Sequence, residues 1–508
     1  MNIKRAKAEI RDTIEAYLKK DAYGDYRIPE IRQRPILLMG PPGVGKTQIM
    51  DEIAGECDIG LVSYTITHHT RQSAIGLPFI VEKTYGGEKH SVTEYTMSEI
   101  IASVYDRIEA SGKKEGILFI DEINCVSETL APTMLQFLQC KTFGNQKVPS
   151  GWVIVSAGNP PEYNKSVREF DVVTLDRVKV INVEADLQVF KEYAYQAGVH
   201  HAVISYLDAH PENFYRSERT VDGMQFVTAR GWEDLSEMMI LYEELGKKMD
   251  EQVIVQYLQY PRIARDFSAY LELYYRYQKD FQVPEILAGR IPAGVLEKLR
   301  YAPFDERVEI VSLLLGALND RIGANRKEDH SLSLIFDFLR SFRQKSSENE
   351  EMPSAELFQK LLDDLRNSVR KREEAGQSER SLREEYREVF LSLERYQRSL
   401  PARDERSAFE LLRGVFEKDR EKLERDSFAV LDLLEHAFDF MEAAFGESTE
   451  MVYFITELSL SPGAASFLRE YECPRYYRYN KALLFEDEEA QVRKELAGIR
   501  REMEGGDL

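Results

Sequence analysis

Apolar residues in the first third of the chain fall into short runs that alternate with stretches of helical periodicity. Five of these runs have the length of buried strands, and they are Ile36–Met39, Leu61–Ile66, Ile117–Ile120, Trp152–Ala157 and Val178–Val183. Strands that alternate with helices predict a parallel sheet that is covered by helices on both faces. An amphipathic helix over residues 3–20 is predicted before the first strand, and the sheet block is predicted to end near residue 184.

Beyond residue 184 the pattern changes to helical spacing. We predict an all-helical domain over residues 185–275 and a helical, highly charged extension over residues 276–508. Within the extension, apolar residues repeat at alternating spacings of four and three before Pro401, and this seam consists of Leu382, Tyr386, Val389, Leu393, Tyr396 and Leu400. The seam fits an ordinary helix–helix interface within one bundle or a docking arm for a partner, and its short length favours the interface.

Composition narrows the class of protein. The 508 residues are 43% hydrophobic and 31% charged, which is typical of a protein with hydrophobic cores and more than one domain. The formal net charge of −21 opposes a general attraction to nucleic acids or anionic membranes. The chain shows no apolar stretch of membrane-span length and no signal core at its first residues, so we expect a cytoplasmic protein. Two histidine pairs, His68 with His69 and His200 with His201, lack metal-ligand spacing.

The loop after the first predicted strand carries the first candidate chemistry. Its sequence, Gly40-Pro41-Pro42-Gly43-Val44-Gly45-Lys46-Thr47, fits G-x-x-x-x-G-K-[ST] at each fixed position, and Gln48 opens a helix. Glycines let backbone N–H groups surround phosphate oxygens, and the helix N-terminus favours their negative charge. Lys46 can reach the β- and γ-phosphates, and the Thr47 hydroxyl can hold Mg²⁺. We therefore predict that residues 40–48 bind a nucleoside triphosphate, the alternative being a chance turn before a helix.

Two later strands end in polar residues. The third predicted strand delivers Asp121 and Glu122 at its carboxyl end, where open α/β sheets bind ligands. Asp121 is suited to hold Mg²⁺, and Glu122 is suited to orient and deprotonate an attacking water. The fourth strand ends at Asn159, which can hydrogen-bond the γ-phosphate or that water, or can merely open the Pro160-Pro161 turn. The residues alone leave both roles of Asn159 open.

These motifs together resemble those of AAA+ ATPases and, more narrowly, those of the MoxR branch. The resemblance covers residues 30–275 and rests on the phosphate loop, Asp121-Glu122-Ile123-Asn124, Gly158-Asn159-Pro160 and Leu175-Asp176-Arg177-Val178. It implies that Asn159 is the sensor 1 residue and that Arg177 is a finger that completes a neighbouring subunit's site. It also implies that Arg230, in Thr228-Ala229-Arg230-Gly231-Trp232, is the sensor 2 arginine. The alternatives are a salt bridge from Arg177 to a nearby carboxylate and an ordinary exposed Arg230 at a helix start.

Two insertions are similar to those of the same branch. Phe79–Tyr95, with a turn at Tyr85-Gly86-Gly87-Glu88, and Lys141–Gly151 are both predicted to form β-hairpins. The resemblance implies that these hairpins face the pore of a ring, whereas the residues themselves fit plain surface hairpins equally well. It further implies a hexamer, a protein client and a partner with a VWA (MIDAS-type) domain.

The predicted fold is an α/β P-loop NTPase core with a five-stranded parallel sheet of the AAA+ type (residues 1–184). An all-α lid (185–275) and an all-α C-terminal extension (276–508) are predicted to follow. The predicted function is Mg²⁺-dependent ATP hydrolysis by an oligomeric, chaperone-like remodelling machine without a membrane anchor. Two other functions stay open: a nucleotide-dependent assembly switch without significant turnover, and a nucleic-acid-associated NTPase, which the net charge disfavours. Glu122 opposes the switch, because a protein that only binds nucleotide does not need a base.

Overall fold

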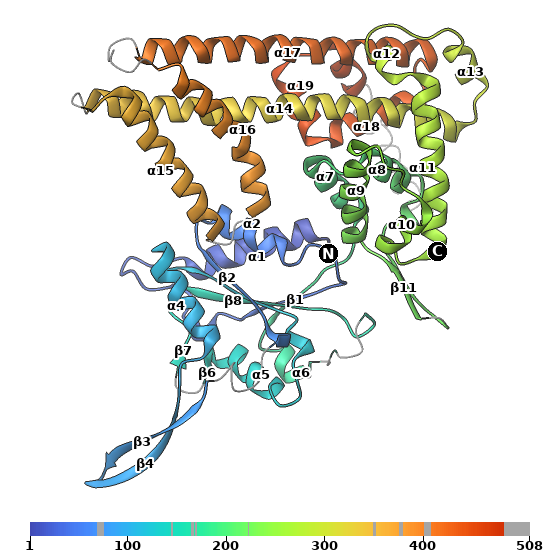
Figure 1. Cartoon of the computed structure of the whole chain (residues 1–508). Helices are drawn as coiled ribbons and strands as arrows, with labels where there is room; N and C mark the ends of the chain where they lie inside the picture. The colour runs from blue at the N-terminus through green and yellow to red at the C-terminus, as the bar shows by residue number, and fades with distance from the viewer. Residues whose placement is uncertain are drawn as a thin grey trace, which may run out of the picture. The chain divides into compact units, whose positions relative to one another are not determined.

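The structure is a computed structural model of the 508-residue chain. It describes residues 1–68, 76–143, 146–163, 167, 170–221, 223–348, 352–374, 379–400 and 408–481. The chain divides into two compact units, whose elements are labelled in Figure 1. The sheet unit comprises Met1–Val189, Tyr215–Gly231 and Arg366–Leu382. The helical unit comprises Phe190–Phe214, Trp232–Leu365 and Arg383–Leu508.

The sheet unit is built on five parallel strands in the order β2-β5-β8-β1-β9. Their bounds are β1 (Ile36–Met39), β2 (Gly60–Thr65), β5 (Gly116–Asp121), β8 (Trp152–Gly158) and β9 (Lys179–Asn182). Each strand agrees with its predicted run to within one residue at either end, which confirms the predicted sheet. Because β1 lies between β8 and β9 and is parallel to both, the loop that follows β1 lies between the carboxyl ends of β8 and β9.

Side chains that alternate along the strands form two separate cores, one on each face of the sheet. On one face, Ile36 and Leu38 belong to a core with residues of α1 (Ile3–Leu18) and α2 (Gln48–Glu56). On the other face, Leu37 belongs to a core with residues of α4 (Glu99–Ser111) and α5 (Ala131–Cys140). A strand covered on both faces must be apolar at successive positions, which explains the continuous apolar run in β1. The predicted N-terminal helix corresponds to α1.

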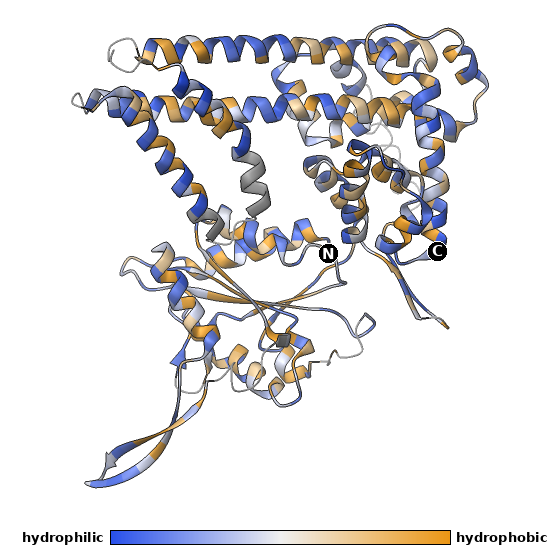
Figure 2. Cartoon of the chain, viewed as in Figure 1, coloured by the Kyte–Doolittle hydropathy of each residue, from blue (hydrophilic) through white to orange (hydrophobic). Residues whose placement is uncertain are grey.

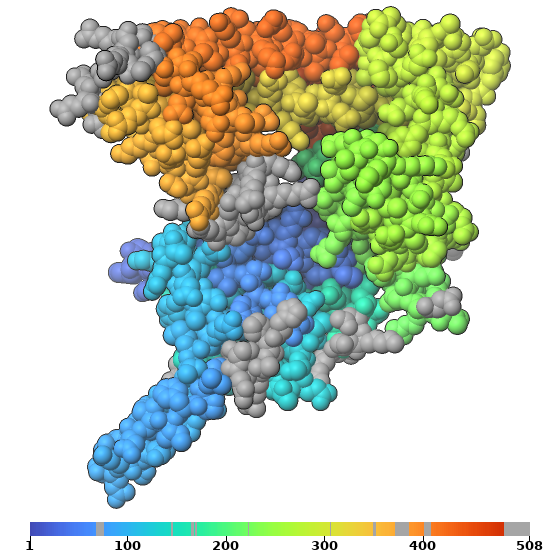
Figure 3. Space-filling view, viewed as in Figure 1, coloured from blue at the N-terminus to red at the C-terminus, as the bar shows by residue number. Residues whose placement is uncertain are grey.

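Two hairpins in the sheet unit confirm the predicted insertions. β3 (Pro78–Tyr85) and β4 (Glu88–Tyr95) pair antiparallel around Gly86 and Gly87, whose φ angles are 62° and 93°. Positive φ at both turn positions is what a two-residue hairpin turn of this hand requires. Figure 3 shows the β3–β4 hairpin projecting away from the rest of the sheet unit. The shorter hairpin pairs β6 (Thr142–Phe143) with β7 (Gln146–Lys147), and its Gly144 lies outside the described residues.

The prediction that residues 185–275 are all-helical is wrong at one place. An antiparallel hairpin of β10 (Arg216–Thr220) and β11 (Gly223–Val227) interrupts the helices of this region. Four of the five β10 residues are exposed, so the strand has no buried face and leaves no alternation of apolar and polar positions in the sequence. The remaining short elements are η1 (Glu30–Arg32), η2 (Ile66–His68), η3 (Ile123–Cys125), α6 (Val172–Leu175) and η4 (Pro211–Asn213).

The other described helices confirm the predicted helical character of the rest of the chain. They are α7 (Leu187–Ala197), α8 (His201–Ala209), α9 (Ala229–Glu244), α10 (Glu251–Tyr257), α11 (Pro261–Phe281), α12 (Val283–Leu287), α13 (Val295–Tyr301), α14 (Phe304–Glu348), α15 (Ser354–Glu374), α16 (Glu379–Arg398), α17 (Ala408–Ala444), α18 (Thr449–Leu460) and α19 (Pro462–Glu470). Within the helical unit, α14 packs against α17, α18 and α19. Figure 2 shows hydrophobic residues interleaved with hydrophilic ones along α14 and α17, as expected of helices that bury only one side. Residue 275, where we predicted the lid to end, lies inside α11, and the predicted domain boundaries stay predictions.

The central part of the seam predicted in the C-terminal region lies on α16 and is buried. Its members Tyr386, Val389, Leu393 and Tyr396 are all at most 7% exposed. The Tyr396 hydroxyl also donates a 2.6 Å hydrogen bond to Asp419 of α17. These contacts support the interpretation of the seam as a helix–helix interface rather than as a free docking arm.

A buried ion network joins α7 and α8 to α18 inside the helical unit. Lys191 Nζ lies 2.6 Å from Asp208 Oδ1 and 2.7 Å from Glu457 Oε1, and the side chains of Lys191 and Glu457 are only 3% and 4% exposed. The Tyr195 hydroxyl donates to the second oxygen of Glu457 at 2.6 Å. A buried charge that loses its partner destabilises a protein by about 3–5 kcal/mol. The network therefore ties helices of the predicted lid to a helix of the predicted extension.

Candidate functional site

The loop after β1 surrounds the buried side chain of Lys46. The ammonium group donates to the carbonyl oxygens of Gly40 and Pro41 and to Asn159 Oδ1, each at 2.8 Å. Gly43 and Gly45 have φ angles of 74° and 86°, which glycine adopts without the strain that a Cβ would cause. The loop leads directly into α2, so it lies at a helix N-terminus, where anions bind favourably.

Thr47 and Asp121 meet across the site. The Thr47 hydroxyl donates to Asp121 Oδ2 at 2.9 Å, and Asp121 Oδ1 accepts from the backbone N–H of Glu122 at 2.8 Å. A hydroxyl next to a carboxylate is a donor set that Mg²⁺ prefers, so these two residues fit the predicted cation.

Glu122 follows Asp121 in an unusual backbone conformation. Glu122 lies between the end of β5 and the start of η3, and its φ of 57° is in the left-handed region. Such a conformation costs a non-glycine residue about 1–3 kcal/mol and is concentrated at functional sites. The half-buried Glu122 is thus turned out of the line of the strand immediately beside the Thr47–Asp121 pair.

Asn159 is held in place by its neighbours on two sides. The Asn124 side chain donates from Nδ2 to the backbone carbonyl of Asn159 at 2.7 Å. A Cβ at the preceding residue, Gly158, would lie 2.6 Å from Asn124 Oδ1, so only glycine allows this approach. Because Asn159 Oδ1 accepts from Lys46, its amide NH₂ is the group left to donate. This role of Asn124 was not predicted, although Asn124 belongs to the run Asp121-Glu122-Ile123-Asn124.

The surroundings of Lys46 lower the pKa of its ammonium group. Burial lowers the pKa of Lys46 to about 8, the charge of Asp121 acts in the opposite direction, and the charge of Arg230 adds to the lowering. An anion bound beside the ammonium would favour its charged form and raise this pKa again.

The segment 215–231 packs against the phosphate loop within the sheet unit. The Tyr215 hydroxyl donates to the carbonyl of Pro42 at 2.9 Å. The Cβ atoms of Thr228 and Arg230 lie 3.1 Å and 3.4 Å from the position that a Cβ would take at Gly43. The structure thus places Arg230 beside the phosphate loop, and its role as the sensor 2 arginine stays a prediction. Tyr215 and Thr228 were missed, because a tyrosine in an aromatic-rich region and a threonine before a helix carry no distinctive sequence signal.

Arg177 lies apart from these residues. It is exposed, and its guanidinium donates to Gln139 of α5. Val172 and Val173 of the adjoining α6 are 81% and 58% exposed. Asp171, a carboxylate near Arg177 in the sequence, accepts from the backbone N–H of Thr174 at 2.7 Å. Among the residues that the structure describes, no recorded hydrogen bond joins Arg177 to the phosphate loop.

Residues 36–174 match the model of the family described as "ATPase family associated with various cellular activities (AAA)". This range contains the phosphate loop, Asp121, Glu122 and Asn159. Residues 36–174 form an AAA ATPase domain. This domain thus belongs to a family that is described as ATPases.

Other comparisons add little to the AAA assignment. The chain resembles a solved structure described as a "putative ATPase" from Cytophaga hutchinsonii ATCC 33406, with 17% identity and a TM-score of 0.21. The likeness covers 36% of this chain and 51% of that one, so it spans about half the length of the solved protein. No curated protein matches the chain. None of the described helices is long and apolar enough to cross a membrane.

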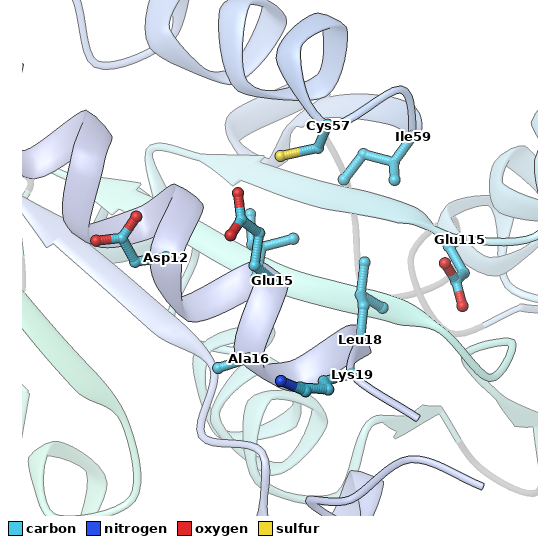
Figure 4. Close-up of a pocket in the computed structure, with 9 residues that line it drawn as sticks. Asp12, Glu15, Ala16, Leu18, Lys19, Cys57, Ile59 and Glu115 are labelled. Atoms are coloured by element: carbon cyan, nitrogen blue, oxygen red, sulfur yellow. The ribbon is translucent and has the colours of Figure 1, made fainter. Parts of the chain in front are cut away.

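The sheet unit also contains a hollow at the amino ends of two strands, away from the phosphate loop. Figure 4 shows it between α1 and the starts of β2 and β5, and its volume is about 640 Å³. Ile59 and Glu115 line it directly before these two strands begin, whereas the phosphate loop follows the carboxyl end of β1. Asp12 and Glu15 add negative charge, which disfavours a phosphate. This hollow is therefore separate from the site of the AAA domain.

Proposed function

We propose that the chain is a MoxR-type AAA+ ATPase that forms a homo-oligomeric ring, hexameric by family resemblance, and remodels a client protein. AAA ATPases typically oligomerise, and the arrangement of this site favours the same for this chain. One observation carries the proposal: Lys46, Asp121 and Glu122 lie together in one chain, whereas Arg177 is exposed beside exposed apolar residues. Because the guanidinium of Arg177 pairs with Gln139 in its own chain, we assign Arg177 to the site of a second subunit.

Each residue has a distinct role in the proposed reaction. Lys46 and the backbone of residues 40–48 bind the triphosphate of ATP, and Thr47 with Asp121 would hold Mg²⁺. When bound, Mg²⁺ neutralises charge on the β- and γ-phosphate oxygens. Glu122 accepts the proton of the attacking water, and the Asn159 amide orients this water or the γ-phosphate.

The two arginines act from different places. Arg230 adds positive charge from the segment 215–231, which contacts the phosphate loop at Gly43. Arg177 of a neighbouring subunit stabilises the charge that develops on the γ-phosphate oxygens, a contribution worth about 10³–10⁵ in rate. The exposed Val172 and Val173 give the surface around Arg177 an apolar area that association would bury.

The β3–β4 hairpin is the element that we assign to the client. Phe79, Ile80 and Tyr85 are 43%, 76% and 54% exposed, on a ribbon that also carries hydrophilic residues, as Figure 2 shows. Large apolar side chains that are exposed on a projecting hairpin favour contact with another protein. A VWA-type partner, which the resemblance implies, is a further candidate for this contact.

We expect the hairpin to determine which proteins the ATP-bound form retains. In a Glu122→Gln background with ATP, a triple variant with serine at Phe79, Ile80 and Tyr85 should lose the proteins that the parent co-purifies. A matched variant with serine at Leu241 and Leu245, which are exposed on or next to α9, should keep them. Mass spectrometry of the retained proteins measures the difference, and identical profiles for both variants would contradict the assignment.

We expect nucleotide affinity to depend on pH through Lys46. The pKa of about 8 in the free protein rises on triphosphate binding, so one proton is taken up per nucleotide above pH 8. Below about pH 7 the lysine is charged in both states, and the uptake vanishes. Between pH 8 and the higher pKa of the complex, the dissociation constant should rise about tenfold per pH unit.

Calorimetry with a non-hydrolysable ATP analogue and Mg²⁺, in buffers of different ionisation enthalpy, measures this uptake. Lys46→Arg should abolish the uptake, because a guanidinium stays charged throughout. Lys141→Arg is the matched control, since burial lowers the pKa of Lys141 to about 8 as well, but its side chain bonds to Gln33 at 3.3 Å. Unchanged proton uptake in Lys46→Arg would disprove the assignment.

A further inference from the structure

The helical unit contains a cavity of about 280 Å³. Residues of α9, α11, α12 and α14 and of the segment 198–201 line it. Part of its wall is apolar and includes Val199, Ile240 and Leu313. Its polar and charged lining residues are His200, His201, Glu243, Tyr274, Gln278 and Asp320. The cavity lies outside the AAA domain and has no role in the proposed hydrolysis.

Glu243 brings one negative charge to this cavity. His200 Nδ1 accepts from the backbone N–H of Ala202 at 3.1 Å, so the proton of a neutral ring is on Nε2, which lies 3.0 Å from Glu243 Oε1. The Tyr275 hydroxyl donates to the same oxygen at 2.7 Å. Burial acts to raise the pKa of Glu243, but the hydrogen bonds from His200 and Tyr275 outweigh it and lower that pKa. Glu243 is therefore ionised near neutral pH.

Asp320 brings a second carboxylate to the same space. Burial raises the pKa of Asp320, whereas His200 and Arg321 act to lower it and the charge of Glu243 acts to raise it. Glu243 and Asp320 thus place two carboxylates at one cavity, and the Glu243 side chain is 44% exposed. Among the described residues that line the cavity there is no lysine or arginine. A cation bound in the cavity would be attracted by both carboxylates.

His201 adds an unusual polar group. Both of its ring nitrogens are buried and have no hydrogen-bond partner among the described residues. A Cβ at Gly316 of α14 would lie 2.6 Å from His201 Cγ, so glycine is required for the ring to approach this helix. Burial lowers the pKa of His201 to about 3, so the ring is neutral and keeps an acceptor nitrogen. A buried acceptor without a partner carries a cost in free energy.

We propose that this cavity binds a small organic cation, an ammonium or guanidinium group on a short aliphatic chain. Glu243 and Asp320 would pair with the charge, and the Tyr274 ring offers an aromatic face for it. Val199, Ile240 and Leu313 would contact the aliphatic chain. The volume suits a molecule of a few heavy atoms or the end of one basic side chain, and excludes a folded segment.

Calorimetry on the full-length chain without nucleotide tests this proposal independently of ATP hydrolysis. The ligands are putrescine and agmatine, with 1,4-butanediol as the uncharged analogue of putrescine. At least one amine should bind, and the diol should not. Glu243→Gln and Asp320→Asn should each weaken the amine at least about tenfold, because each removes one of the two charges that pair with it. Glu244→Gln, a change at the exposed neighbouring residue, is the matched control and should bind as the parent does.

A short peptide with a single lysine tests whether the cation that binds is a free amine or a basic side chain of a protein. Tighter binding of the peptide than of agmatine would assign the cavity to a protein side chain, and the reverse would assign it to a free amine. Thermal unfolding of each variant without ligand verifies that a lost signal is not a lost fold. The absence of binding by putrescine, agmatine and the peptide, or equal weakening in Glu244→Gln, would overturn the proposal.

Discussion

The Arg177→Ala variant is expected to lose at least about 10³-fold in ATP turnover per subunit while it binds nucleotide as the parent does. The reason is that the side chain acts on a neighbour's γ-phosphate, whereas in its own chain its guanidinium donates to Gln139. The turnover of the parent should accordingly rise with protein concentration as subunits assemble. Steady-state phosphate release, measured beside light scattering over the same concentrations, tests both statements.

Mixing two inactive variants makes this prediction specific. Arg177→Ala keeps its own Glu122, and Glu122→Gln keeps its Arg177, so sites with both groups form only between unlike subunits. An equal mixture should therefore regain about a quarter of the parent rate, if neighbours associate head to tail at random. Arg32→Ala, a change at another exposed arginine of the sheet unit, is the control and should stay within about twofold of the parent. A mixture that stays inactive, or an Arg177→Ala variant as active as Arg32→Ala, would refute the inter-subunit site.

The Glu122→Gln variant is expected to lose about 10²–10⁴ in turnover, the contribution typical of a general base. The substitution keeps the size of the side chain but removes its ability to accept the proton of the attacking water. Nucleotide affinity should not fall, since Lys46, Thr47 and Asp121 are unchanged. A single-turnover assay with ATP and a separate binding assay distinguish the two effects.

Glu128→Gln is the matched control for this variant, because Glu128 is exposed in the loop that follows η3. It should hydrolyse ATP at the parent rate. A Glu122→Gln variant that turns over like this control would exclude Glu122 as the base. It would then favour the nucleotide-dependent switch over the remodelling machine.

The parts of the fold that the sequence predicted are those where burial leaves a periodic trace. β1 is covered on both faces, so Ile36, Leu37 and Leu38 are all apolar and the strand was located to the residue. The turn of the β3–β4 hairpin was located because Gly86 and Gly87 supply the positive φ that it needs. β10 was not predicted, because its mostly exposed polar residues show no alternation of apolar and polar positions. Its formation as a strand depends on tertiary structure.

In the candidate site, too, residues of contiguous motifs were predicted and residues from distant segments were not. Lys46, Thr47, Asp121 and Glu122 belong to contiguous motifs whose spacing follows from phosphate chemistry, and the structure brings them together. Tyr215 reaches Pro42 only because the chain returns to the phosphate loop far along the sequence. The cavity beside His201 depends on one glycine of α14, and no local pattern relates residue 201 to residue 316. Contacts of this kind exist only in the folded chain.

The Lys191 network has a consequence for how this protein can be divided. A chain cut at residue 275 would end inside α11 and would lack Glu457, one of the two carboxylates that neutralise the buried ammonium. The helices at 190–214 and 232–275 would then keep the buried ammonium of Lys191 with only one of its two carboxylate partners, Asp208. They are therefore not a transplantable module that gene fusion or truncation could separate from the C-terminal helices.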